Sequence, residues 1–250
     1  MAGSPPAAPQ RPAPQRPARP LRNYDLVAGV YDLGCHVYSG GAIAASKRAH
    51  LRFVSAGDRV LYLGVGTGAE AVEACANGAA VTAVDLSPKM LARLRRRLDA
   101  RGLDAELILG DALAHRRSGQ YDAVVAHYFF NLFEPEAMRA ALRQAAALLR
   151  PGGRLIVADL APPRGGRLRR LLNHAYSKAA TAAFLALRLA PWRPNYHYAA
   201  ECRAVGLQAE GTIPFRWAGA GPIFFETVVA RRPDRPPTRP PPTPGPADPN

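Results

Sequence analysis

The stretch Arg59-Val-Leu-Tyr-Leu-Gly-Val-Gly-Thr-Gly68 decides the fold, because a short apolar run ends there in three glycines at alternate positions. The apolar run has the length of a buried strand, and a helix is predicted from Gly68 to about Asn77. Thr67 and Glu70 have the spacing of a capping box, which predicts that their side chains close the start of this helix. Glycine accepts backbone angles that other residues resist, and it lets a ligand approach the chain closely. The stretch therefore predicts a strand, a tight turn and a helix, with a ligand at the turn.

The same alternation continues along the chain. Apolar runs predict further strands at residues 80–84, 105–109, 121–127, 154–159, 207–214 and 222–230. Helices are predicted from the N-cap Ser87 onward, over 134–149 and over 198–206. Strands and helices that alternate through short connections pair in parallel by right-handed crossovers. The predicted fold is an α/β domain with a doubly wound, mostly parallel sheet of seven strands, helices on both faces and an antiparallel last strand.

The prolines divide the chain into a body and two tails. The chain has 250 residues, and 16 of its 25 prolines lie in residues 1–20 and 231–250. A composition of 48% hydrophobic and 21% charged residues is enough for one sizeable core. We therefore expect disordered tails at 1–20 and 232–250, and one folded domain over 21–231.

The net charge and the cysteines limit which partners and which cellular compartment are expected. The formal net charge is +14, of which residues 23–230 carry +8, so anionic partners such as lipid surfaces, nucleic acid or metabolites are favoured. The cysteines, Cys35, Cys75 and Cys202, form no CxxC pair, which fits a reducing compartment and predicts no metal site. The chain shows no secretory signal, and its most apolar window is too short to span a bilayer. These features predict a cytoplasmic protein, with peripheral contact to a membrane as a further option.

Two groups of residues beyond the glycines point to a nucleotide-like cofactor. Asp85 directly follows the second strand, where a carboxylate can accept hydrogen bonds from both hydroxyls of a ribose. This feature suits a nicotinamide or an adenosyl cofactor, because Gly64-x-Gly66-x-x-Ala69 also fits the dinucleotide fingerprint. Gly110-Asp-Ala112 follows the third strand, where an acid and a backbone amide can contact the edge of adenine. A nicotinamide-dependent reductase is disfavoured because no Tyr-x-x-x-Lys pair follows the fourth strand.

Five motifs in register resemble those of the class I S-adenosylmethionine-dependent methyltransferases. They are Gly64–Glu70, Val84–Met90, Gly110–Ala112, Tyr121–Val125 and Leu149–Gly153. The resemblance covers about residues 24–230. It is strongest to the ubiquinone/menaquinone C-methyltransferase-like or phosphatidylethanolamine N-methyltransferase-like branch, whose entry helix repeats Tyr-Asp as this chain does at Tyr24 and Tyr31. The resemblance implies a Rossmann-like fold, S-adenosyl-L-methionine as cofactor and methyl transfer as activity.

The resemblance also implies roles for individual residues. The glycine loop would line the methionine and ribose part of the cofactor through Gly64, Gly66, Thr67 and Gly68. Asp85 would bind the ribose hydroxyls, and the adenine would be contacted by Leu86, Met90, Asp111 and Ala112, with core packing as the alternative for Met90. His127, at the end of the fourth strand, would touch the cofactor, face the acceptor and serve as the candidate catalytic base.

One position departs from the family pattern. Where the family commonly has an acid in the first strand, this chain has Tyr62. That acid orders the loop or reaches the amino group of the cofactor's methionine, so the partner of this ammonium group is unassigned. The hydroxyl of Tyr62 or the carboxylate of Glu70 could take its place, and a degenerate, non-methylating relative is an alternative.

The acceptor side is less defined. A long insert over 161–198 begins with arginines and continues as an apolar helix, which suits a lid over an apolar acceptor, membrane contact through 164–190, or an ordinary packing helix. The expected substrate is a small apolar or lipid-like molecule. Nucleic acid is not expected, because no RNA-binding module and no Asn-Pro-Pro-Tyr-like signature is present. An interaction protein that acts through its Pro/Arg-rich tails is a further alternative.

Overall fold

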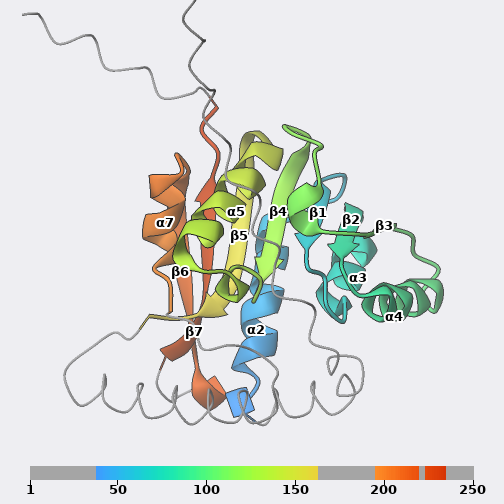
Figure 1. Ribbon diagram of the computed structural model, residues 1–250. Helices are drawn as coiled ribbons and strands as arrows, with labels where there is room; N and C mark the ends of the chain where they lie inside the picture. The colour runs from blue at the N-terminus through green and yellow to red at the C-terminus, as the bar shows by residue number, and fades with distance from the viewer. Residues whose placement is uncertain (1–37, 163–194, 220–222, 235–250) are drawn as a thin grey trace, which may run out of the picture.

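The computed structural model describes residues 38–162, 195–219 and 223–234 (Figure 1). The predicted tail at 1–20 lies outside these ranges, and so does the predicted tail at 232–250 except for its first three residues. Most of the predicted insert at 161–198 also lies outside them. The strands are β1 Arg59–Leu63, β2 Ala80–Asp85, β3 Glu106–Leu109, β4 Tyr121–His127, β5 Leu149–Leu160, β6 Gln208–Arg216 and β7 Ile223–Arg231. The α-helices are α2 Ala42–Arg48, α3 Ala69–Ala76, α4 Pro88–Asp99, α5 Pro135–Leu148 and α7 Tyr198–Ala204. Short 3₁₀ turns are η1 Ala49–Phe53, η2 Ala112–Ala114, η3 Phe130–Leu132 and η4 Trp217–Gly219.

The sheet has the predicted topology. Its seven strands lie in the order β3-β2-β1-β4-β5-β7-β6. The first five strands pair in parallel, whereas β7 runs antiparallel to both β5 and β6. The strand order reverses beside β1, so the carboxyl ends of β1 and β4 form the switch point at which such sheets bind ligands. The prediction of a doubly wound α/β fold with an antiparallel last strand is confirmed.

Both faces of the sheet are covered by helices (Figure 1). In β4, Val124 and Ala126 face the core that α5 and α7 close, whereas Ala123 and Val125 face the core that α3 and α4 close. Alternate side chains of a strand point to opposite faces, so a strand that is buried on both faces is apolar throughout. This explains why the central strands are continuous apolar runs in the sequence.

The helix after β2 begins as predicted. The hydroxyl of Ser87 accepts a hydrogen bond from the Met90 N–H at 3.3 Å, and Pro88 occupies the first helical position. The buried face of α4 is formed by Met90, Leu91, Leu94 and Leu98. This cap fixes the direction in which the chain leaves the carboxyl end of β2.

The predicted capping box at the start of α3 is wrong. The helix begins after Gly68, whose left-handed φ of 70° turns the chain, and no side chain caps it. The carboxylate of Glu70 instead lies 3.0 Å from the ammonium group of Lys47. The carboxylate of Glu70, which a capping box would need, therefore forms an ion pair with Lys47 of α2 instead.

The boundary between α5 and β5 also differs from the prediction. The strand begins at Leu149 rather than at Arg154, because Leu149 already pairs with Tyr121 of β4. A Cβ atom at Gly153 would lie 2.8 Å from the carbonyl oxygen of Tyr121. The Gly-Gly turn thus lies within the strand and lets it pass close to its neighbour.

Candidate functional site

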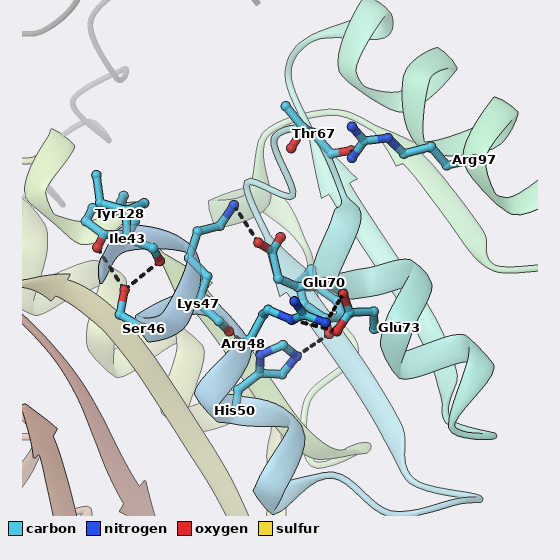
Figure 2. Close-up of polar contacts among 11 residues, drawn as sticks. Ile43, Ser46, Lys47, Arg48, His50, Thr67, Glu70, Glu73, Arg97 and Tyr128 are labelled. Carbon is cyan, nitrogen blue, oxygen red and sulfur yellow. Dashed lines mark hydrogen bonds and ion pairs between the residues drawn. The ribbon is translucent and has the colours of Figure 1, made fainter. Parts of the chain in front are cut away.

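The glycine loop joins β1 to α3, and each of its glycines has a positive φ, with values of 68°, 58° and 70°. A Cβ atom at Gly64 would lie 2.8 Å from the ring of Phe129, and one at Gly68 would lie 2.8 Å from the side chain of Leu94. Apart from Gly66 itself and its two chain neighbours, no atom of the described residues lies within 4 Å of the place where a Cβ of Gly66 would be. Gly64 and Gly68 are therefore needed for packing, whereas Gly66 borders open space. The carbonyl oxygen of Thr67 accepts a hydrogen bond from Arg97 at 2.8 Å, which ties the loop to α4 (Figure 2).

Asp85 connects the glycine loop to the loop after β2. Its carboxylate accepts hydrogen bonds from the N–H of Gly66 at 3.0 Å and from the N–H of Ser87 at 2.8 Å. Burial raises the pKa of Asp85, and the N–H groups of Ser87 and Gly66 act in the opposite direction. The N–H of Leu86 also bonds to this carboxylate, and since a carboxylate has about four acceptor sites, capacity remains for a hydroxyl of a vicinal diol. The structure thus brings together two of the predicted cofactor motifs.

The loop after β3 provides the third motif. The carboxylate of Asp111 accepts a hydrogen bond from the N–H of Leu113 at 2.9 Å, and Ala112 is buried in the core. A pocket of about 410 Å³ opens here, lined by Val84, Ile108, Gly110, Asp111, Ala114, His115, Arg116 and Arg117. Leu86 is 43% exposed at the same edge, whereas Met90 is 7% exposed and packs inside α4. Of the two apolar residues predicted to contact adenine, Leu86 is exposed at this edge and Met90 is largely buried, and both contacts stay predictions.

His127 ends β4 beside two other polar rings. Its ring centroid lies 4.9 Å from that of His50 and 6.4 Å from that of Tyr62. Its Nε2 atom is buried, and no donor or acceptor among the described residues reaches it. Burial lowers the pKa of His127 well below its usual value, and the nearby His50 and Lys47 lower it further. The imidazole is therefore neutral at pH 7 and has an unused nitrogen.

The helix α2 contributes contacts that the sequence analysis missed. The hydroxyl of Ser46 lies 2.9 Å from the hydroxyl of Tyr128, directly after β4, and donates to the carbonyl of Ile43 at 2.8 Å (Figure 2). At the following turn, Nε2 of His50 lies 2.6 Å from the hydroxyl of Tyr62. No motif marks these residues, because their partners are distant in the sequence and each residue type is common on surface helices.

Aromatic and apolar side chains gather beside the same edge of the sheet. Phe224 and Phe225 of β7 are buried against Tyr38 and Tyr128. Tyr128 has a positive φ of 51°, an uncommon conformation for a bulky residue and one that is found most often at functional sites. Trp217 is 42% exposed, and its indole N–H donates to the carbonyl of Tyr38 at 3.0 Å. This side of the site is apolar, and polar atoms lie at its rim.

The residues present fit an adenosyl cofactor. The open space over Gly66 leaves room for a ligand against the loop, and Asp85 offers acceptors where a ribose would lie. The exposed Leu86 offers an apolar contact for a flat base. The departure at Tyr62 remains, because the hydroxyl of this residue is used by His50 inside the protein.

Comparisons with known proteins agree with this arrangement. Residues 60–153 match the family model described as a methyltransferase domain. A demethylmenaquinone methyltransferase of Thermus thermophilus is 37% identical over 148 residues, which are 57% of this chain and 66% of that protein. A demethylmenaquinone methyltransferase of Mycolicibacterium gilvum is 32% identical over 206 residues, which are 78% of this chain and 86% of that protein. Against the first four curated relatives, the chain spans between 57% and 66% of their length.

A solved structure supports the fold alone. It is a 1,6-didemethyltoxoflavin-N1-methyltransferase of Burkholderia thailandensis with bound S-adenosylhomocysteine, which is 21% identical to this chain, with a TM-score of 0.59 and coverage of 92% of this chain and 94% of that one. The curated relative of which this chain covers 86% decides the family. The chain belongs to the class I S-adenosylmethionine-dependent methyltransferases, in the branch that is similar to the ubiquinone/menaquinone C-methyltransferases.

Proposed function

We propose that the protein transfers a methyl group from S-adenosyl-L-methionine to a small apolar acceptor with a quinone-type ring. The observation that carries the cofactor assignment is the carboxylate of Asp85, which is bonded to the N–H of Gly66 and so holds the two cofactor loops together at the switch point. The assignment of the acceptor is supported by the demethylmenaquinone methyltransferase of which this chain covers 86%. The apolar side chains at the same edge of the sheet also suit such a ring.

The cofactor supplies a methyl group that is activated by its bond to a positively charged sulfur. The chain has to align the acceptor and take up the single proton that methylation of a ring carbon releases. If a ring hydroxyl gives up this proton first, the hydrogen displaced from the methylated carbon later restores that hydroxyl. A hydroquinone becomes nucleophilic at carbon when a ring hydroxyl gives up its proton. We assign this proton to His127, because its imidazole is neutral and its Nε2 has no partner among the described residues, and its lowered pKa means that the proton is released again readily. In this proposal Gly66, Asp85, Leu86 and Asp111 bind the cofactor, and His127 is the catalytic base.

The aromatic groups at the end of β4 orient the acceptor. Tyr128 is held by its hydrogen bond to Ser46 and packs at 6.4 Å, centroid to centroid, against Phe225. Its positive φ of 51° and its hydrogen bond to Ser46 of α2 set the position of the ring. A fixed aromatic surface of this kind binds a planar ring better than a flexible headgroup. This favours a quinone-type ring over an amine-bearing lipid.

Contact of the protein with a membrane surface is a further prediction of this proposal. No helix among the described residues is both long and apolar enough to cross a membrane. The acceptors of the named relatives are lipid-like, so contact of residues 164–190 with an anionic surface remains an expectation. Absence of nucleic-acid binding and a cytoplasmic location likewise remain expectations.

Transfer of a radioactive methyl group tests the proposal. The protein is incubated with labelled S-adenosyl-L-methionine and a chemically reduced demethylnaphthoquinone, and parallel reactions contain the oxidised quinone or phosphatidylethanolamine. We expect label in the reduced quinone alone, because only the hydroquinone can supply a nucleophilic ring carbon. Label in phosphatidylethanolamine instead would overturn the acceptor, and tight binding of NADH without binding of S-adenosylhomocysteine would overturn the cofactor.

A further inference from the structure

The residue that stands in place of the family's first-strand acid is already fully engaged. The hydroxyl of Tyr62 lies 2.6 Å from Nε2 of His50 and donates to the carbonyl oxygen of Glu70 at 3.3 Å. The Tyr62 side chain is buried, and burial followed by the charge of Glu70 raises its pKa well above the usual value. Tyr62 is therefore a neutral internal contact that supports the start of α3. It has no charge with which to bind an ammonium group.

A charged pair lies at the start of α3 instead. Glu70 is the second residue of α3, directly after the glycine loop, and its Oε1 lies 3.0 Å from Nζ of Lys47. The side chain of Glu70 is 9% exposed and that of Lys47 is 21% exposed. Figure 2 shows Lys47 reaching from α2 to Glu70. The pair thus combines a nearly buried carboxylate with an ammonium group on the side of the glycine loop.

Both members of this pair keep unused bonding capacity. An ammonium group has three donors and a carboxylate has about four acceptor sites, so one mutual contact leaves most of them open. Charges this far buried are stable only when they are well compensated. A ligand with one positive and one negative end, as in a free amino acid, matches the pair in both signs.

The position of Lys47 is fixed from several sides. The carbonyl of the preceding residue, Ser46, accepts a hydrogen bond from the hydroxyl of Thr227 in β7 at 2.6 Å. The carbonyl of Lys47 itself lies 2.5 Å from Nδ1 of His50, whose other nitrogen meets Tyr62. These contacts fix the backbone from which the Lys47 side chain extends, and the ion pair with Glu70 holds its ammonium group.

We propose that Lys47 and Glu70 form the subsite for the amino acid end of S-adenosyl-L-methionine. The carboxylate of Glu70 accepts hydrogen bonds from the methionine ammonium group, and the ammonium group of Lys47 donates to the methionine carboxylate. The pair thereby supplies the charge that is lost at Tyr62, and α2 becomes part of the cofactor site. This inference rests on the proposed function, because it assumes an adenosyl cofactor with a free amino acid end.

Two ligands separate this subsite from the rest of the cofactor site. S-adenosylhomocysteine contains the amino acid end, whereas 5′-methylthioadenosine has the same nucleoside and sulfur but lacks it. Calorimetry measures the affinity of each ligand for the wild type and for Glu70→Gln and Lys47→Met. We expect each variant to bind S-adenosylhomocysteine about tenfold more weakly, because a charge-assisted hydrogen bond is lost. Affinity for 5′-methylthioadenosine should change by less than about twofold.

The neighbouring ion pair provides a matched control. Arg48 and Glu73 also join α2 to α3, at 2.9 Å, but their side chains are 62% and 27% exposed and lie one turn further from the glycine loop. Arg48→Met and Glu73→Gln remove a contact of the same kind, so they report what the loss of an α2–α3 ion pair does by itself. We expect both to leave the affinities for both ligands unchanged.

The outcomes distinguish failure of this inference from failure of the proposed function. Equal weakening of both ligands by Glu70→Gln and Lys47→Met, or no weakening of either, overturns the subsite. If Glu70→Gln does not fold, shown by a lost melting transition, Lys47→Met alone decides the question, because its aliphatic chain remains in place. If the wild type binds neither ligand, the proposed cofactor itself is wrong.

Discussion

Replacement of Asp85 tests whether the switch point holds an adenosyl cofactor. The carboxylate accepts hydrogen bonds from the Gly66 N–H at 3.0 Å and from the Ser87 N–H at 2.8 Å. In Asp85→Asn the side chain keeps its shape, but its NH₂ group must face one of these two N–H donors. In Asp85→Ala both contacts are lost. Asp85→Ala thus releases the glycine loop from the β2 loop and removes both acceptor oxygens, whereas Asp85→Asn removes the charge and one of the two oxygens.

The magnitude follows from the hydrogen bonds concerned. A hydrogen bond to a charged group contributes about 1.5–3 kcal/mol before water replaces it. With partial replacement by water we expect both variants to weaken S-adenosylhomocysteine binding at least about tenfold, which corresponds to about 1.4 kcal/mol. Affinity for 5′-methylthioadenosine should fall equally, because that ligand also contains the ribose. Isothermal calorimetry measures both affinities.

Asp58→Ala is the control for this experiment. The carboxylate of Asp58 also accepts a hydrogen bond from a backbone N–H, that of Ser55 at 2.7 Å, but it lies at the amino end of β1. This variant should lose some thermal stability and keep its ligand affinity. Unchanged affinity in both Asp85 variants would refute the assignment of the ribose site, since no other contact in the argument depends on this carboxylate.

Three further predictions concern the loop, the core and the tails. Gly66→Val should abolish binding of S-adenosylhomocysteine, because its side chain would fill the open space at a φ of 58°. The control Gly57→Val, at a φ of 85° in similarly open space, should lower only the melting temperature. If Gly66→Val binds S-adenosylhomocysteine as tightly as the wild type, the loop is only a turn. Burial raises the pKa of Asp159 from 3.8 to about 7, so this carboxyl keeps its proton to a higher pH in the native state than in the unfolded state. The free energy of unfolding should therefore fall by about 4 kcal/mol as the pH rises from 4 to above 7. Asp159→Asn should therefore raise the melting temperature at pH 8 and change it little at pH 4, and the same gain at both pH values would contradict this origin. Deletion of residues 1–20 and 235–250 should leave the melting temperature nearly unchanged, and a large fall would place folded structure in those segments.

The sequence determined the fold because its signals are local. An apolar run followed by glycines predicts a strand and a turn, and Ser87-Pro88 predicts a helix start, whatever lies elsewhere in the chain. The carboxyl edge could also be predicted, because parallel strands place all their loops there. For this reason Gly66, Asp85 and Asp111 were expected at one edge of the sheet, and the structure brings them there.

Where local signals competed, the sequence alone could not decide. The spacing of Thr67 and Glu70 fits a capping box, but a lysine from another helix holds the carboxylate. Met90 fits an adenine contact as well as a core position, and only the structure shows that its side chain is 7% exposed on the buried face of α4. Such choices depend on which partner arrives from elsewhere in the chain.

The contacts of α2 were decided by tertiary structure alone. Ser46 meets Tyr128 across 82 residues and Thr227 across 181 residues, and His50 meets Tyr62 inside the protein. No period or spacing in the sequence records such pairs, because they depend on how the helix lies against the finished sheet. The sequence by itself therefore determined the doubly wound sheet and the edge where a cofactor can bind. Only the packing of α2 against that edge decided which charged groups stand beside the glycine loop.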